Sequence, residues 1–305
     1  MDTTRLIQQV YSDNIEMACR ALQELGLVAP TDLLARSFLR EIALKAEKSR
    51  LRKTAAESLA RLNLQEAVAT FLAASRSLDP GQRVRGIEGL GVIGAVELIN
   101  EVYTALNSAD QQIVRAAVVA LGRIGRDLRA ADILEQFTQK PYLPQDLLDN
   151  ARRSLTYILV RLAYEEKKDL NQHKQAVRRL AMLAPAFARE KFQGSALNND
   201  PEKRAVAYIN LGILGDVNGL DTVIKGLADP DCRARRMAAI ATGKLDRTGT
   251  AIAALTRATS GPPEVRQAAI QAIEIIRNRI NASRNENFLN SRKFQREGSY
   301  EPLAF

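Results

Sequence analysis

Hydrophobic side chains recur along this chain with a period of 31 residues. Six anchor positions share the register: Leu59, Leu90, Leu121, Leu211, Thr242 and Ile273. A small residue always lies four positions before the anchor, an apolar residue lies three positions after it, and glycine often follows it directly. These offsets fall on one face of a 3.6-residue helix, so each period is predicted to contain one helix with a defined buried face.

The start of this helix is marked by proline. Pro80, Pro201 and Pro263 each lie ten residues before their anchors, and Asp79 and Asp200 directly precede the first two. Aspartate followed by proline suits a helix N-terminus, because the carboxylate accepts a free backbone N–H and proline has no N–H to leave unpaired.

A second helix fits between one anchor and the next prolyl cap, for example over Val96–Leu106 and Asn218–Leu227. Two helices in a period of this length are typical of a solenoid. We therefore predict an all-α fold, a right-handed α-solenoid (superhelix) of helical hairpins with an extended C-terminal tail.

Three regions are predicted. Residues 1–49 form an N-terminal helical capping region with helices at about Thr3–Tyr11, Asn14–Leu25 and Thr31–Lys48. Residues 50–279 form the repeat solenoid, which is irregular around 141–200 because the motif fades there. Residues 280–305 form a polar tail, interpreted either as disordered or as a docking segment whose apolar contacts are made by Phe288, Phe294 and Phe305.

Composition narrows the choice of partner. Lys plus Arg is 44 and Asp plus Glu is 35, and the net charge of +9 favours an acidic partner: nucleic acid, an anionic membrane or an acidic protein. The N-terminus lacks the pattern of a signal peptide, and no run of about 18 apolar residues predicts a transmembrane helix. We expect a cytoplasmic location, or a membrane surface that the protein reaches through a partner.

The strings IVRAAVVALGRIG (113–125), KRAVAYINLGILGD (203–216) and DPDCRARRMAAIATGKL (229–245) resemble HEAT repeats. More narrowly, they are similar to the phycobilisome lyase HEAT-like repeat family, over about two-thirds of the chain. That resemblance implies a cyanobacterial protein that attaches or detaches bilin chromophores on cysteines of phycobiliproteins, or an accessory factor of the phycobilisome. Phycobiliproteins are acidic, which agrees with the basic charge of this chain.

A second helical face, at offsets −6, −2 and +2 from the anchor, is the predicted binding surface. It mixes aliphatic residues with cations, as suits an acidic protein surface with an apolar centre. Its predicted binding residues are Lys53, Arg61, Arg115, Arg123, Arg236 and Lys244. Nucleic acid would call for a denser basic track and stacking aromatics, which this face lacks.

A column of arginines lies seven residues before the anchor, and a column of aspartates lies four residues before those arginines. Arg52, Arg83, Arg204, Arg235 and Arg266 make the first column, with Arg115 shifted by one residue, and Asp79, Asp110, Asp200 and Asp231 make the second. A ladder of cations for an anionic ligand is one interpretation. The favoured one is structural: each aspartate caps its helix and pairs with an arginine of its own or a neighbouring repeat.

Few residues suggest catalysis. Cys232 is predicted at a helix N-terminus beside Arg233 and Arg235, a setting that favours a reactive thiolate, whereas Cys19 is predicted to pack in the core. The only histidine, His173, lies in a basic stretch and is interpreted as a solvated surface residue. One histidine and no CxxC spacing predict no metal site.

Three functions remain open at this stage. The leading hypothesis is a protein-binding scaffold or assembly factor for an acidic protein, with a phycobilisome-associated accessory or linker-like protein as its specific form. The second is a bilin lyase or lyase subunit, the only form that would need a cofactor, the bilin. The third is a nucleic-acid-binding HEAT protein. An enzyme is the less favoured reading, and the oligomeric state stays open.

Overall fold

The computed structural model describes residues 2–164 and 169–297, and these residues form helices and connecting turns without a strand. The fold is an all-α solenoid built from stacked helical hairpins, as predicted. The chain divides into two compact units between Arg161 and Leu162. No helix in the described ranges is long and apolar enough to cross a membrane.

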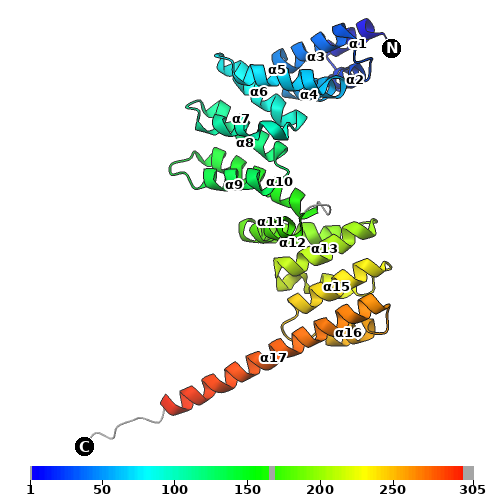
Figure 1. Cartoon of the computed structure of the whole chain (residues 1–305), viewed down its shortest axis with the longest axis vertical. Helices are drawn as coiled ribbons and strands as arrows, with labels where there is room; N and C mark the ends of the chain where they lie inside the picture. The colour runs from blue at the N-terminus through cyan, green and yellow to red at the C-terminus, as the bar shows by residue number, and fades with distance from the viewer. Residues whose placement is uncertain (1, 165–168, 298–305) are drawn as a thin grey trace, which may run out of the picture. The chain divides into compact units, whose positions relative to one another are not determined.

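Unit 1 holds the N-terminal hairpins (Figure 1). Its helices are α1 (Thr3–Val10), α2 (Ile15–Leu25), α3 (Leu33–Lys45), α4 (Ser49–Leu62), α5 (Leu64–Ser75), α6 (Pro80–Ile93), α7 (Ile99–Thr104), α8 (Gln111–Ile124), α9 (Leu128–Thr138) and α10 (Gln145–Tyr164), whose last residues pass into unit 2. The anchor helices α4, α6 and α8 pack one on the next. The three helices predicted before residue 50 are confirmed as α1, α2 and α3.

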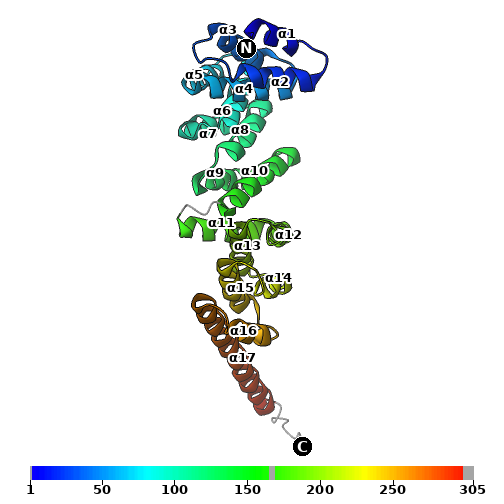
Figure 2. The same ribbon diagram turned by 90° about the vertical axis from the view of Figure 1, so that its right-hand side faces the viewer.

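Unit 2 repeats the arrangement (Figure 2). Its helices are α11 (Leu170–Leu183), α12 (Pro185–Ser195), α13 (Pro201–Leu214), α14 (Leu220–Gly226), α15 (Cys232–Leu245), α16 (Ile252–Ala258) and α17 (Pro263–Glu297). The anchor helices α13, α15 and α17 pack in sequence, and α12, α14 and α16 form the second row. The predicted second helices are confirmed as α7, which has a 3₁₀ turn at each end, and α14, which follows one 3₁₀ turn.

The predicted helix starts are confirmed. Pro80, Pro201 and Pro263 are the first residues of α6, α13 and α17. The Asp79 and Asp200 carboxylates accept backbone N–H groups at 2.8 and 3.0 Å, and Asp110 and Asp231 cap α8 and α15 in the same way. Each carboxylate satisfies a donor that the first turn leaves without an intrahelical partner.

The glycine that follows an anchor marks the place where the next anchor helix packs. A Cβ on Gly91 would lie 2.7 Å from the Cα of Ala120, and one on Gly243 would lie 2.9 Å from the Cα of Ala272. Real side chains do not approach backbone so closely, so glycine sets the spacing of the stack. In the helix that begins at Pro263, Glu274 takes this position.

The segment that we predicted to be irregular keeps more of the repeat than its sequence indicates. In α10, Leu155 lies 34 residues after Leu121, and Ala151 and Ile158 stand at the small and apolar offsets, all buried. In α11, the buried Leu180 lies 31 residues before Leu211. Only five residues separate α10 from α11, too few for the second helix that follows the other anchors.

The C-terminal segment differs from the prediction of a tail that begins at residue 280. Helix α17 continues to Glu297, and Figure 1 shows its last turns running past α16. No glycine or proline occurs between Pro263 and Gly298, so the polar composition does not interrupt the helix. Phe288 and Phe294 lie on α17 at positions whose side chains are not described, and Phe305 lies outside the described residues.

Candidate functional site

A groove opens across the anchor helices of unit 1, and we call it the unit-1 groove. Its cavity volume is about 300 Å³, and it lies on α4, α6 and α8. It is lined by Lys53, Val84, Glu88, Gln112, Arg115, Ala116, Val119, Ala120 and Arg123. Six of these nine residues occupy offsets −6, −2 or +2 from an anchor. The structure therefore brings three predicted binding residues, Lys53, Arg115 and Arg123, to one cavity.

The charges of the unit-1 groove are only partly neutralised. Glu88 accepts a hydrogen bond from Arg52 at 3.1 Å, and the exposed Arg115 pairs with Asp146 at the start of α10. Lys53 and Arg123 form no ion pair with any residue that the structure describes. Two unpaired cations beside the aliphatic Val84 and Val119 give a surface that suits a carboxylate next to an apolar side chain.

Sequence reasoning missed the continuation of this surface on α10. Tyr157 lies two residues after Leu155, the offset that Arg123 has from Leu121, and its side chain is 59% exposed. The Arg161 guanidinium lies 5.5 Å from the Tyr157 ring centroid, and its Nη1 donates to the carbonyl of Arg123 at 3.1 Å. An exposed tyrosine held by an arginine is a frequent anchor of protein interfaces.

The anchor positions themselves could have predicted Tyr157. Between Leu121 and Leu155 the spacing grows from 31 to 34 residues, so a strict period places the anchor helix three residues too early. Allowing that insertion restores Ala151, Leu155 and Ile158 to their columns and predicts Tyr157 on the binding face.

The remaining predicted binding residues lie outside the unit-1 groove. Arg61 is exposed on α4. Arg236 and Lys244 lie in unit 2, on α15, together with Ile240, which is half-buried. On the adjacent α13, Ala205 is buried and Ile209 and Ile213 are half-buried, so the face predicted from the repeat is apolar at its centre there.

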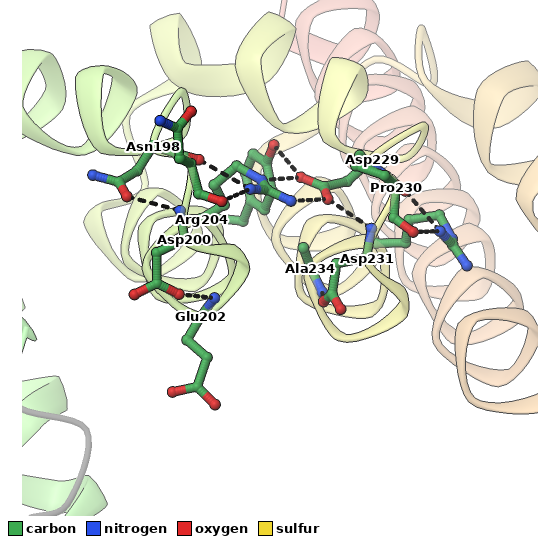
Figure 3. A network of polar contacts seen from close by, with 11 residues as sticks. Asn198, Asp200, Glu202, Arg204, Asp229, Pro230, Asp231 and Ala234 are labelled. Atoms are coloured by element: carbon green, nitrogen blue, oxygen red, sulfur yellow. Dashed lines mark hydrogen bonds and ion pairs between the residues drawn. The ribbon is translucent and has the colours of Figure 1, made fainter.

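The arginine column is structural, but its partners differ from those predicted. Arg204 donates to the backbone carbonyls of Asn198 and Asn199 at 2.9 and 3.0 Å, and to both carboxylate oxygens of Asp229 at 2.8 and 2.7 Å (Figure 3). Asp229 is two residues before the capping Asp231, whose own N–H it accepts at 2.9 Å. Arg204 is thereby a link from α13 to the loop before α15.

The same carbonyl contacts recur along the column. Arg52 donates to the carbonyls of Ala46 and Glu47, and Arg235 donates to those of Asp229 and Pro230. In each case the acceptors lie five and six residues before the arginine. Among the described residues the capping aspartates form no ion pair with the column, contrary to the prediction. Their carboxylates accept N–H groups of their own helices, and Arg52, Arg204 and Arg235 bind the loop backbone that precedes the cap. The charge of Asp231 still acts on Arg204, because it helps to raise the pKa of that arginine.

The surroundings of Asp229 and Tyr208 shift the pKa values of both groups. Burial alone would raise the pKa of Asp229, but the hydrogen bonds from Arg204 and from the backbone outweigh it and hold that pKa below its usual value. Burial, aided by the nearby Asp229 carboxylate, raises the pKa of Tyr208 to about 12. The side chain of Asp229 is 3% exposed, so these groups serve the packing of unit 2 rather than a ligand.

His173 is not the solvated surface residue that we predicted. Its Nε2 lies 2.7 Å from Oδ1 of Asn210, which is fully buried and donates through Nδ2 to the carbonyl of Ala163. Burial chiefly lowers the pKa of His173; the neighbouring Lys174 lowers it further, and the hydrogen bond to Asn210 opposes both. The sequence around His173 shows the neighbouring cations. It does not show the contact with the buried Asn210, which lies 37 residues away in the chain.

The predicted catalytic candidate gains no partner for chemistry. Cys232 is the first residue of α15, partly exposed and free. Arg233 pairs with Glu202, and Arg235 binds carbonyls, so both arginines near the thiol are engaged elsewhere. Cys19 is buried in the core, as predicted. Among the described residues, no group of three or more His, Cys, Asp or Glu side chains could hold a metal ion.

Comparison with known protein families gives a match within unit 2. Residues 194–274 match the family model described as HEAT repeats. That segment of the α-solenoid is thus similar to HEAT repeats. A search of curated proteins finds no significant match.

Solved structures with a similar trace include other helical repeat proteins. Importin beta is 14% identical with a TM-score of 0.37, over 90% of this chain and 40% of its own. The complex of CpcE and CpcF of phycocyanin lyase from Nostoc sp. PCC7120 is 15% identical with a TM-score of 0.34, over 90% and 95%. Human deoxyhypusine hydroxylase is 18% identical with a TM-score of 0.33, over 90% and 96%.

Proposed function

We propose that this protein is a non-catalytic scaffold that binds an acidic protein partner in the unit-1 groove. The observation that carries the proposal is the coincidence of the predicted binding face with a cavity on α4, α6 and α8. The unpaired Lys53 and Arg123, the exposed Val119 and the exposed Tyr157 supply cationic, aliphatic and aromatic contacts on one surface.

The chemistry of the unit-1 groove favours binding over catalysis. Its nine lining residues include no cysteine, histidine or hydroxyl side chain, and its one carboxylate, Glu88, is paired with Arg52. A carboxylate of the partner would meet Lys53 or Arg123, and an aliphatic side chain would cover Val84 and Val119. Partly covered ion pairs of this kind are weakened by salt, while the apolar contact survives screening.

Within that class of partner, a phycobiliprotein or a phycobilisome linker is the specific candidate. Support comes from the resemblance of the repeat strings to the phycobilisome lyase HEAT-like family and from the net charge of +9. The resulting role is that of an accessory or linker-like protein of the cyanobacterial phycobilisome, in the cytoplasm or at a thylakoid surface that the protein reaches through its partner.

The test is affinity capture of a partner by the full-length chain. Wild-type protein and the Arg115→Glu/Arg123→Glu variant are immobilised and exposed to a cyanobacterial extract, and bound proteins are identified by mass. Arg5→Glu/Arg20→Glu is the charge-matched control, because Arg5 and Arg20 are exposed on α1 and α2, in the same unit and outside the groove. We expect an acidic phycobiliprotein or linker with wild type and with the control, and its loss with the groove variant.

Two results would count against the proposal. Equal capture by the groove variant and by wild type would remove the unit-1 groove from the function. Capture of an acidic protein unrelated to phycobilisomes would keep the scaffold and remove its specific form.

A bilin lyase is the competing proposal, and the partly exposed thiol of Cys232 favours it. The solenoid would then orient a bilin against the acceptor cysteine of an apo-phycobiliprotein, and proximity would supply most of the rate. Mixing the chain, bilin and apo-phycobiliprotein, with and without a partner subunit, tests this. The absence of a covalent coloured product in every mixture would remove the lyase.

A further inference from the structure

Unit 2 carries a second cationic surface, separate from the groove that the proposed function uses. Lys174 and Arg178 lie one turn apart on α11, and Lys244 lies in the last turn of α15. We call these three residues the unit-2 basic cluster. Helix α13 packs against both α11 and α15, so the cluster surrounds the exposed side of α13.

Two contacts fix the position of the cluster. The ring of His173 is held by Asn210 of α13 at 2.7 Å, which fixes the start of α11, including the adjacent Lys174, against α13. From the other side, the stem of Lys244 lies over Gly212 of α13: a Cβ there would be 3.4 Å from Cδ of Lys244. The missing side chain of Gly212 leaves room for Lys244 to lie across the helix.

The cluster brings three cations close together. Lys174, Arg178 and Lys244 form no ion pair among the residues that the structure places. Burial lowers the pKa of Lys244, and the charges of Lys174 and Arg178 lower it further, so the three cations act on one another. Like charges held together by the fold are stabilised when an anion joins them.

An apolar strip accompanies the charges. Ile209 and Ile213 on α13 and Ile240 on α15 are half-buried, and Arg236 adds an exposed cation on the N-terminal half of α15. These residues include no aromatic side chain on which a nucleotide base could stack, which argues against single-stranded nucleic acid. A surface with aliphatic and cationic positions suits a peptide that carries both carboxylates and aliphatic side chains.

We propose that this surface of unit 2 binds an acidic, amphipathic segment of a partner protein. At least two carboxylates of the segment contact Lys174, Arg178 and Lys244, and an aliphatic side chain packs on Ile209, Ile213 and Ile240. Each unit then carries one cationic site for an acidic partner. A partner that binds both sites would gain avidity.

The test uses a fluorescent 12-residue peptide of glutamate and leucine, with glutamine replacing glutamate in the control peptide. Binding is measured by anisotropy on the full-length chain carrying Arg115→Glu/Arg123→Glu, so that the unit-1 groove does not contribute. We expect Lys174→Glu/Arg178→Glu to weaken binding at least tenfold. The charge-matched Lys203→Glu/Lys225→Glu variant, at exposed positions of α13 and α14, should change it less than threefold.

A second measurement needs no substitution in the cluster. With lysines labelled by reductive ¹³C-methylation, the pKa of Lys244 should rise when the peptide binds, because carboxylates offset the charges of Lys174 and Arg178. Equal loss of binding in the cluster and control variants, or an unmoved Lys244 resonance, would overturn the proposal. Tighter binding of a single-stranded DNA of equal charge, with a steep salt dependence, would replace the acidic segment by nucleic acid. Because the groove is disabled throughout, none of these results depends on the proposed function.

Discussion

Replacing Asp229 by alanine removes a buried carboxylate of unit 2 that accepts four hydrogen bonds. It accepts from Arg204 Nε and Nη2 at 2.8 and 2.7 Å, from the Tyr208 hydroxyl at 3.2 Å and from the Asp231 N–H at 2.9 Å. Its side chain is 3% exposed. The alanine variant leaves a guanidinium and a hydroxyl without their acceptor in the interface between α13 and α15.

The expected loss of stability follows from that geometry. Removing one member of a buried ion pair costs about 3–5 kcal/mol, because the remaining charge is left uncompensated. Arg204 keeps two carbonyl acceptors, so we expect the lower end of this range, about 3 kcal/mol. Glu202→Ala is the control: Glu202 and Arg233 are 61% and 55% exposed, and such a pair is worth at most about 1 kcal/mol.

Urea unfolding and amide hydrogen exchange measure the effect. Repeats can open separately, so exchange of α13 and α15 amides reports the local free energy that a single midpoint would average. The pKa of Asp229 is lowered in the folded chain, so its contribution is present above the pKa of an unfolded aspartate, about 4, and is lost as pH falls through the folded value. The difference in unfolding free energy between wild type and Asp229→Ala should therefore become smaller at acid pH. If the loss of unfolding free energy for Asp229→Ala lies within about 1 kcal/mol of the control's at neutral pH, the reasoning is refuted.

Three further predictions concern packing and protonation. Gly91→Ala should lower the free energy of unfolding by about 1–3 kcal/mol, because the added Cβ would lie 2.7 Å from the next helix. Gly194→Ala should raise it by about 0.5–1 kcal/mol, because nothing lies within 4 Å of the added Cβ. Urea unfolding of both variants tests the pair. Ile87 and Ile270 occupy the same repeat position, but Ile87 is 2% exposed and Ile270 is 52% exposed. Ile87→Ala should therefore lower the free energy of unfolding by about 2–5 kcal/mol, and Ile270→Ala by less than about 1 kcal/mol. Equal losses in the two variants would contradict the stacking of the repeats. Since burial lowers the pKa of His173, NMR titration of this single histidine should give a pKa below 6.5, and stability should fall as pH drops below that value; a normal pKa would show that the ring is solvated.

The repeat and its helix caps could be predicted from the sequence because they depend on local rules. The apolar offsets, the Asp–Pro starts and the glycine after the anchor each have a cause within one helix or one neighbouring pair. The anchor at Leu155 was missed because three extra residues shift it, and the column cannot show an insertion until packing reveals which leucine is buried.

Contacts between distant residues could not be predicted. The partner of Arg204 is Asp229, 25 residues away, and nothing in either local pattern distinguishes it from the capping Asp231. The binding face could be predicted as a set of columns, but its concentration into a cavity at Lys53, Arg115 and Arg123 depends on how three helices pack. The end of α17 was missed because polar composition was taken for the absence of a helix.

The most direct test of the binding account is hydrogen–deuterium exchange of the full-length chain with and without its captured acidic partner. The account predicts slower exchange in α4, α6, α8 and the Tyr157 region of α10, the elements that carry the groove and its continuation. Protection confined to the second-row helices α12, α14 and α16, with unchanged exchange in α4, α6 and α8, would contradict it.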